Sequence, residues 1–374
     1  MVIFIRTQMI KAVLVVMALL VILLLGMYFF SQYDNNSTVF VDDSMKEFLT
    51  LKVQDIFNKR NQAILNKKSD ILDSLYDKSV RNGLWAYEHE IKKMKYLHSW
   101  SNRQSVDFTN INSQIIVRSI KEKGNGYTLN ILASTEYEYY YLDSPEIKNT
   151  FRIGTYHSLD LMPKDDKLLI TKEWYTDPFA DSLHLDELKN EEIKKIISSG
   201  EPRDLSSLNE RRIKAVEYAD KFCGAASLPE HGFKYNPKYR NYNSQGGDCT
   251  NFASQIMYAG GFKKNGTWNY SNGAGSKAWV NAQGFKDYML YSGRASLITN
   301  GSYDKVLKAS YKLLPGDIVA YEKKGKIAHI SIVTGIDSKG YALVNSHNSD
   351  RYRVPWDLGW NDKGIKFWLI HVHF

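Results

Sequence analysis

Cysteine is scarce in this 374-residue chain, which contains only Cys223 and Cys249. Two cysteines allow at most one disulfide, so the fold must depend on its apolar core and not on covalent cross-links. Hydrophobic residues make up 43% of the chain and charged residues 24%, which is enough apolar material for a core. The length predicts about two or three domains.

Motifs that read RNA or DNA are also absent, although the formal net charge is +8. The lysines are scattered along the chain and do not form a basic stripe. We therefore expect no nucleic-acid partner. A basic balance of this kind favours attraction to anionic lipid or to a wall polymer.

One long apolar run, AVLVVMALLVILLLGMYFF, occupies residues 12–30. About twenty helical residues cross a hydrocarbon core, and the basic residues Arg6 and Lys11 before the run predict a cytoplasmic N-terminus. A secretory signal has a shorter apolar core and a small-x-small cleavage site, so the run favours an uncleaved anchor. We expect residues 1–33 to form a cytoplasmic tip and a single-pass anchor in the cell membrane. The rest of the chain is then extracytoplasmic, or secreted if the segment is a cleaved signal peptide.

Residues 39–180 are predicted to form an α+β domain. Apolar residues at spacings of three and four predict helices between residues 43 and 100. Alternation with period two predicts strands at 106–121, 127–142, 151–161 and 167–174. Helices followed by an antiparallel meander form an α+β fold, and the pattern resembles the cone-shaped helix-on-curved-sheet folds of the nuclear-transport-factor-two type.

A charged segment at 181–206 lacks the strand pattern, and we expect a linker that carries a short helix. The sequence SLNE at 207–210 has the spacing of a capping box and predicts the first helix of a last domain, 207–374.

The stretch GGDCTNFASQ, residues 246–255, places Cys249 at the expected start of another helix. Asp248 suits the N-cap position, and Gly260 and Gly261 suit the helix end. The first helical turn stabilises a thiolate through its unpaired N–H groups and the positive end of the helix dipole. Such a thiolate is a nucleophile if a histidine pairs with it.

His329 lies in a predicted strand, 327–335, among apolar residues. Taken alone, a histidine there is more typical of a core position that needs a polar partner. The next predicted strand, 341–347, places Asn345 and His347 on one face. Either side chain could hydrogen-bond the His329 ring, as the third member of a catalytic triad does.

Two other roles for Cys249 are open at this point. Cys249, His329 and His347 could supply three zinc ligands, but spacings such as C-x-x-C, H-x-x-x-H and H-E-x-x-H are absent. A disulfide with Cys223 would remove the nucleophile. We favour Cys223 as a small core residue at the end of the preceding helix.

The segments GGDCTNFASQIMYAGG, LLPGDIVAY, AHISIVTG and VNSHNSD occur in this order. Together with AVEYADKF, YNPKYRNY and AWVNAQGF they resemble the family called "Putative amidase domain" of Gram-positive secreted proteins. That family belongs to the papain-like group, with the NlpC-like wall peptidases and the CHAP domains. The resemblance covers about residues 207–374. It implies a papain-like fold in which a helix carrying the cysteine packs on an antiparallel sheet carrying the histidine.

The resemblance also implies catalytic roles. Cys249 would be the nucleophile and His329 the base, with His347 or Asn345 as the third catalytic residue.

Four further residues are candidates for the oxyanion hole or for substrate contact. Gln245 would supply the upstream oxyanion donor, with Asn243 as the alternative. Asp248 would contact substrate amines or only cap the helix. Trp279 would line the cleft or belong to the core.

We therefore expect an extracytoplasmic cysteine amidohydrolase or peptidase that needs no cofactor. The resemblance implies cell-wall peptides as its substrate, cleaved at an amide bond through a thiolate–imidazolium mechanism. The alternative is a non-catalytic wall-binding or assembly protein, which would bind the same material unchanged after Cys249→Ala.

Overall fold

The computed structural model describes residue 17 and residues 42–179, 182, 191–362 and 364–374. Within these residues, no helix combines the length and the apolar character needed to cross a membrane. The predicted tip and anchor, 1–33, lie outside the described residues apart from Met17.

The first half of the described chain has three helices followed by four strands, as the periodicity predicts. The helices are α2 (Asp43–Asn66), α3 (Ser69–Asp73) and α4 (Arg81–Gln104). The strands are β1 (Val106–Lys123), β2 (Gly126–Tyr141), β3 (Ser144–Lys164) and β4 (Lys167–Tyr175). They form an antiparallel meander in which each strand pairs with the next.

The second half begins with α5 (Glu191–Ser198), the short helix expected in the linker. Its other helices are α6 (Glu210–Phe222), α7 (Cys249–Ala259), α8 (Lys277–Val280), α9 (Ala282–Tyr291) and α10 (Tyr303–Ser310). Its long strands are β7 (Ala295–Gly301), β8 (Ile318–Lys323), β9 (Lys326–Ile336), β10 (Ala342–Ser346), β11 (Asp350–Pro355) and β12 (Ile365–Val372). A small hairpin joins β5 (Tyr270–Ser271) and β6 (Ala274–Gly275).

The first turn of α6 differs from the expected capping box. The helix begins at Glu210, and the Asn209 side chain accepts a hydrogen bond from Arg212 N at 3.0 Å. Asn209 is therefore the N-cap, and the prediction that the box begins at Ser207 is wrong by two residues.

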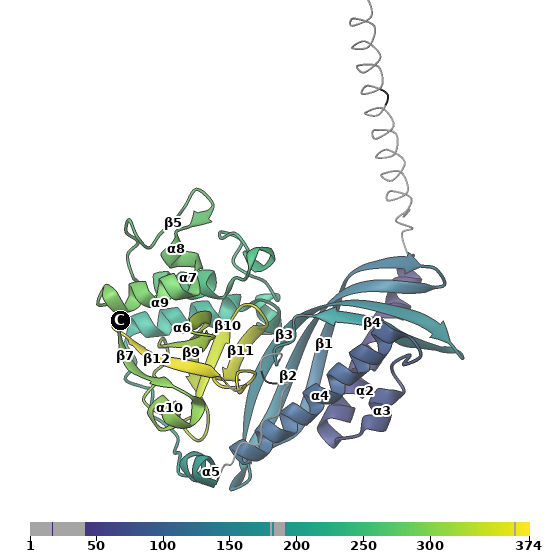
Figure 1. Cartoon of the computed structure of the whole chain (residues 1–374), viewed down its shortest axis with the longest axis horizontal. Coiled ribbons are helices and arrows are strands. Elements are labelled where there is room, and N and C mark those ends of the chain that lie inside the picture. The colour runs from purple at the N-terminus through teal and green to yellow at the C-terminus, as the bar shows by residue number, and fades with distance from the viewer. Residues whose placement is uncertain (1–16, 18–41, 180–181, 183–190, 363) are drawn as a thin grey trace, which may run out of the picture. The chain divides into compact units, whose positions relative to one another are not determined.

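The strands of the two halves belong to one sheet, with the order β1-β2-β3-β11-β10-β9-β8-β12-β7 and β4 beside β3 (Figure 1). The junction is the antiparallel pair β3–β11, in which Asp350 lies opposite Gly154. A Cβ atom at Gly154 would lie 2.4 Å from Ala225 Cβ, so the close approach there requires glycine. The mixed α+β class with a large antiparallel sheet is confirmed, while the domain boundary at 206–207 stays a prediction.

Two apolar clusters lie against the C-terminal strands. Ile330 and Ile332 of β9 belong to the cluster that contains Phe252 and Ile256 of α7. The alternate residue Val333 belongs to the other cluster, with Tyr321 of β8 and helices α4 and α10. Because side chains alternate between the faces of a strand, this division shows which β9 side chains face α7.

Candidate active site

Cys249 is the first residue of α7, as the sequence predicts. Both cysteines are free thiols, so the disulfide alternative is wrong. The Cys249 thiol is buried, with Thr250 Oγ1 at 3.7 Å from its sulfur. Burial raises the pKa of this thiol, and hydrogen bonds from the Ile330 backbone and Thr250 offset part of that effect. In this arrangement the thiol form predominates at neutral pH.

A glycine loop precedes the cysteine. Gly246 and Gly247 have φ values of 106° and 127°, which other residues rarely adopt. A Cβ atom at Gly247 would lie 1.9 Å from Asn348 Nδ2, and Asn348 Oδ1 accepts a hydrogen bond from Asp248 N at 2.6 Å. Asn348 therefore fixes the backbone just before Cys249. Sequence reasoning missed this role, although the residue stands in the VNSHNSD segment.

Asp248 occupies the N-cap position, but its side chain does not cap the helix. Its carboxylate accepts hydrogen bonds from Tyr242 N and Asn251 Nδ2, both at 2.9 Å, and bonds His347 Nδ1 at 2.6 Å. The side chain is almost fully buried. Asp248 thus links Tyr242, helix α7 and His347, the residue that follows β10. The expectation that its side chain caps the helix is wrong.

His347 is enclosed on every side. Its ring lies between Phe252 and Tyr235, with centroids 3.8 and 3.9 Å away. Its Nε2 bonds the Phe222 carbonyl oxygen at 2.8 Å, while Nδ1 bonds Asp248. Both partners are hydrogen-bond acceptors, so a ring nitrogen that carries a hydrogen donates it directly to the acceptor that it faces.

His329 faces the opposite side of β9 from α7. It lies directly across from Tyr321, whose ring centroid is 5.4 Å away, and it stacks on Trp360 at 5.1 Å. Its Nε2 is buried and has no hydrogen-bond partner. Burial, with smaller contributions from nearby positive charges, lowers the pKa of His329 to about 3, so the ring is neutral.

The structure therefore brings the Cys249 thiol to the backbone beside His329 but not to its ring. Ile330, whose backbone bonds the thiol, is the next residue along β9. A register shift between β8 and β9 follows the Tyr321–His329 pair. The predicted catalytic role of His329 stays a prediction.

Both the oxygen and the nitrogen of the Asn345 amide bond residues other than His329. Its Oδ1 accepts from Thr334 Oγ1 at 2.6 Å and from Arg353 N at 2.7 Å, and its Nδ2 donates to Asp220 at 2.9 Å. Since His329 Nε2 has no partner, the contact expected from Asn345 or His347 is absent. The two residues hold the fold around α6 and α7 in this structure.

The contacts of Gln245 and Trp279 are with residues other than Cys249. Gln245 is exposed in a short 3-10 helix, with its side chain beside Arg240. Trp279 is completely buried and donates from Nε1 to Asn251 Oδ1 at 2.9 Å. The structure thus supports the core alternative for Trp279. Within the described residues, no three His, Cys, Asp or Glu side chains are grouped as a metal site would require.

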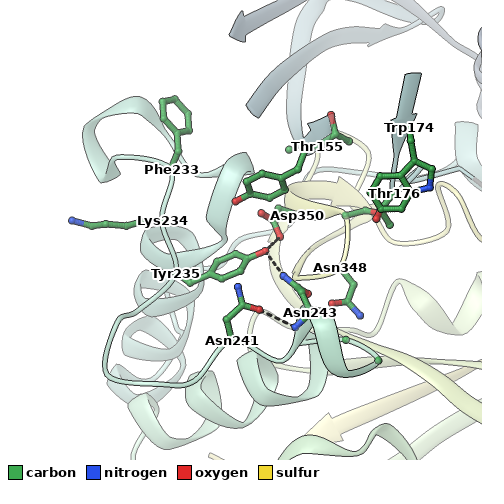
Figure 2. Close-up of a pocket in the computed structure, with 15 residues that line it drawn as sticks. Thr155, Trp174, Thr176, Phe233, Lys234, Tyr235, Asn241, Asn243, Asn348 and Asp350 are labelled. Carbon is green, nitrogen blue, oxygen red and sulfur yellow. Dashed lines mark hydrogen bonds between the residues drawn. The ribbon is translucent and has the colours of Figure 1, made fainter. Parts of the chain in front are cut away.

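A pocket of about 710 Å³ opens next to the glycine loop (Figure 2). It is lined by Gly154, Thr155, Tyr156, Trp174, Thr176, Phe233, Lys234, Tyr235, Asn241, Asn243, Gly246, Gly247, Asn348, Ser349 and Asp350. Its volume is typical of small-molecule sites. Among the residues predicted for the site, only Asn243 lines this pocket. Gly246 and Gly247 also line it, and they stand just before Cys249 in the sequence.

The half-buried Tyr235 and the buried Asp350 are hydrogen-bonded to each other at this pocket. Tyr235 donates to Asp350 Oδ1 at 2.6 Å and accepts from Asn243 Nδ2 at 3.0 Å, as Figure 2 shows. Ala225 N donates to Asp350 Oδ2 at 2.7 Å. Burial raises the pKa of Asp350 to about 6. Sequence reasoning quoted both residues within motifs but assigned them no role.

Comparison with known families decides the identity of the C-terminal half. Residues 209–370 match the family described as "Putative amidase domain". This segment is an amidase-family domain. The amidase domain contains α7, β9 and the loop that carries His347, whereas Gly154, Thr155, Tyr156, Trp174 and Thr176 of the pocket lie outside it.

Two relatives come from Bacillus subtilis (strain 168). "Uncharacterized protein YhbB" is 32% identical over 172 residues, which cover 43% of this chain and 50% of the relative. "Uncharacterized protein YjcM" is 28% identical over 204 residues, which cover 50% of this chain and 46% of the relative. The chain thus spans about half the length of the curated relatives it matches.

Among solved structures, the intermembrane space region of chloroplast protein ARC6 aligns with a TM-score of 0.24 and 11% identity. The alignment covers 34% of this chain and 95% of that one. A TM-score this low identifies no common fold.

Proposed function

We propose that this protein is an extracytoplasmic, membrane-anchored cysteine hydrolase that cleaves an amide bond in cell-wall peptides. The observation that carries the proposal is the position of Cys249. Within an amidase-family domain, this thiol begins helix α7 directly behind a glycine loop that lines a pocket of about 710 Å³. We also propose that residues 207–374 have the papain-like fold and that residues 39–180 have the cone-like one.

The proposed reaction uses the N-terminus of α7. Its free N–H groups and helix dipole stabilise the thiolate and then the oxyanion formed when sulfur attacks the amide carbonyl carbon. The C–N bond breaks as the departing nitrogen takes a proton from the imidazolium. Water then hydrolyses the thioester and restores the thiol.

In this proposal His329 is the base, as the family resemblance implies. Its ring is neutral and its Nε2 has no hydrogen-bond partner, whereas both nitrogens of His347 are engaged. Base catalysis requires the His329 ring to leave Trp360 and face Cys249. The irregular β8–β9 register next to His329 suits such a change, because β-bulges re-aim side chains.

The test is to incubate the full-length chain with wall muropeptides and identify products by mass spectrometry. We expect turnover by the wild type and none by Cys249→Ala, while Cys223→Ala, altered at the other buried cysteine, retains activity. His329→Gln should lower kcat by about 10²–10⁴-fold. Full activity of Cys249→Ala would refute the proposal.

A second candidate function is non-catalytic wall binding or assembly. The buried thiol with its raised pKa and the His329 ring on the far face of β9 both favour it. In that case the wild type and Cys249→Ala would bind muropeptides equally and neither would produce fragments. Iodoacetamide would then modify Cys249 slowly at neutral pH, with a rate that rises steadily with pH and does not depend on His329.

A further inference from the structure

One wall of the pocket comes from the sheet that precedes the amidase domain. Trp174 of β4 lies opposite Ser158, two residues beyond Tyr156 on β3, so Trp174 and Tyr156 share a face of the sheet. Both rings line the pocket, and they are 65% and 44% exposed. Aromatic rings exposed together in a concave site indicate a binding surface more strongly than scattered ones do.

The polar groups of the pocket are mainly neutral. Amides come from Asn241, Asn243 and Asn348, and hydroxyls come from Thr155, Thr176, Ser349 and the tyrosines. Each amide both donates and accepts hydrogen bonds, and so does each hydroxyl.

The two charged lining residues do not form an ion-binding site. Both oxygens of the Asp350 carboxylate already accept hydrogen bonds, from Tyr235 and Ala225. Lys234 is exposed, and in Figure 2 its side chain extends away from Asp350 and Asn348. The pocket therefore suits an uncharged ligand with many hydroxyl or amide groups.

We propose that this pocket binds a sugar ring of a glycan carrying acetamido groups, and that Trp174 and Tyr156 determine its specificity. The C–H face of a pyranose packs on an aromatic ring, while its hydroxyl and acetamido groups exchange hydrogen bonds with asparagine and threonine side chains. The proposal deepens the proposed function, on which it rests for the cleavage of an amide bond near the bound sugar. It identifies the sheet of residues 39–180 as part of the substrate site.

The binding test uses the full-length Cys249→Ala chain, so that hydrolysis cannot affect the result. A soluble N-acetylglucosamine tetrasaccharide is titrated by calorimetry against this protein and against versions that also carry Trp174→Ala or Tyr156→Ala. We expect each added substitution to raise Kd about tenfold or more, as for aromatic residues central to a binding site.

Matched controls come from exposed aromatic residues outside the pocket, Trp85→Ala and Tyr291→Ala, which are 52% and 89% exposed in the native chain. They should leave Kd within about twofold. Circular dichroism of every variant verifies folding, and the exposure of Trp174 makes a folding defect in its variant unexpected.

Two results would overturn the proposal: absence of saccharide binding, or binding that Trp174→Ala and Tyr156→Ala leave unchanged. If a wall-type tetrapeptide binds in place of the saccharide and Trp174→Ala abolishes that binding, the ligand class is wrong. Saccharide binding without any hydrolysis by the wild type would support this inference while refuting the proposed hydrolase.

Discussion

Asp357 connects the two halves of the described chain through a buried carboxylate. Its side chain is fully buried and accepts hydrogen bonds from Arg103 and, at 3.1 Å, from Trp100 Nε1, both on α4. It also accepts from Tyr341 at 2.7 Å and from Asn361 at 2.9 Å. We predict that Asp357→Asn destabilises the whole unit, because the amide removes the negative charge and turns an N–H₂ group towards donors.

The expected loss is about 3–5 kcal/mol, the usual cost of leaving one partner of a buried ion pair uncompensated. Since domains are typically stable by about 5–15 kcal/mol, this is a large part of the total. Urea denaturation of the full-length chain, followed by tryptophan fluorescence, measures the loss as a lower transition midpoint.

Asp143→Asn is the matched control, because Asp143 also pairs across the two halves, with Lys339 at 3.1 Å. That pair is partly exposed, with 46% and 16% of the two side chains accessible, so its loss should cost about 1 kcal/mol or less. Equal losses in the two variants would refute the reasoning. So would a transition of residues 207–374 that occurs separately and is unaffected by Asp357→Asn.

Three further predictions concern the site. Gly247→Ala should strongly reduce any muropeptide cleavage and lower the thermal midpoint, because the new Cβ meets Asn348 in a backbone conformation unfavourable for alanine; unchanged cleavage would contradict it. Burial raises the pKa of Asp350 to about 6, so folding favours its protonated form. Stability should therefore fall as pH rises from about 4 to about 6, by up to about 3 kcal/mol, and urea titrations across this range should show a flatter dependence in Asp350→Asn. His347→Gln should cost about 1–3 kcal/mol in urea denaturation by leaving the buried Asp248 carboxylate without one of its hydrogen-bond partners, and a cost near zero would contradict this role.

Local sequence patterns were sufficient for much of the secondary structure. The alternation in residues 127–142 corresponds to β2, Gly126–Tyr141, because half-buried strands place every second side chain in the core. The turn residues before Cys249 and the glycines after the helix likewise correspond to the ends of α7. Both features depend on neighbours within about ten residues.

The orientation of His329 could not be predicted in this way. The alternation of side chains along a strand assigns His329, Ser331 and Val333 to one face of β9, but it does not say which face α7 covers. That choice follows from packing with residues distant in the sequence: Ile330 and Ile332 belong to the cluster that contains Phe252, and the His329 ring stacks on Trp360. A strand pattern with apolar residues on both faces carries no signal for it.

The role of Asp248 was also beyond local reasoning. An aspartate before a helix usually caps it. Here the Asp248 side chain instead bonds His347, which is 99 residues away in the sequence. The buried carboxylate has three hydrogen-bond partners there, Tyr242 N, Asn251 Nδ2 and His347 Nδ1, and none of them is an N–H group of the first helical turn.

The pairing of strands β3 and β11 contributes both to the sheet and to the pocket. Gly154 and Asp350 face each other across this pair, and both line the pocket. The strand pairing that makes one sheet of the two halves therefore also builds the site beside the glycine loop. Residues 207–374 alone would retain Cys249, His329 and His347 but would lose the Tyr156 and Trp174 wall, and the backbone of β11 would become an unpaired edge. It follows that strands β3 and β4 form part of this pocket, so under the proposed function they belong to the substrate site.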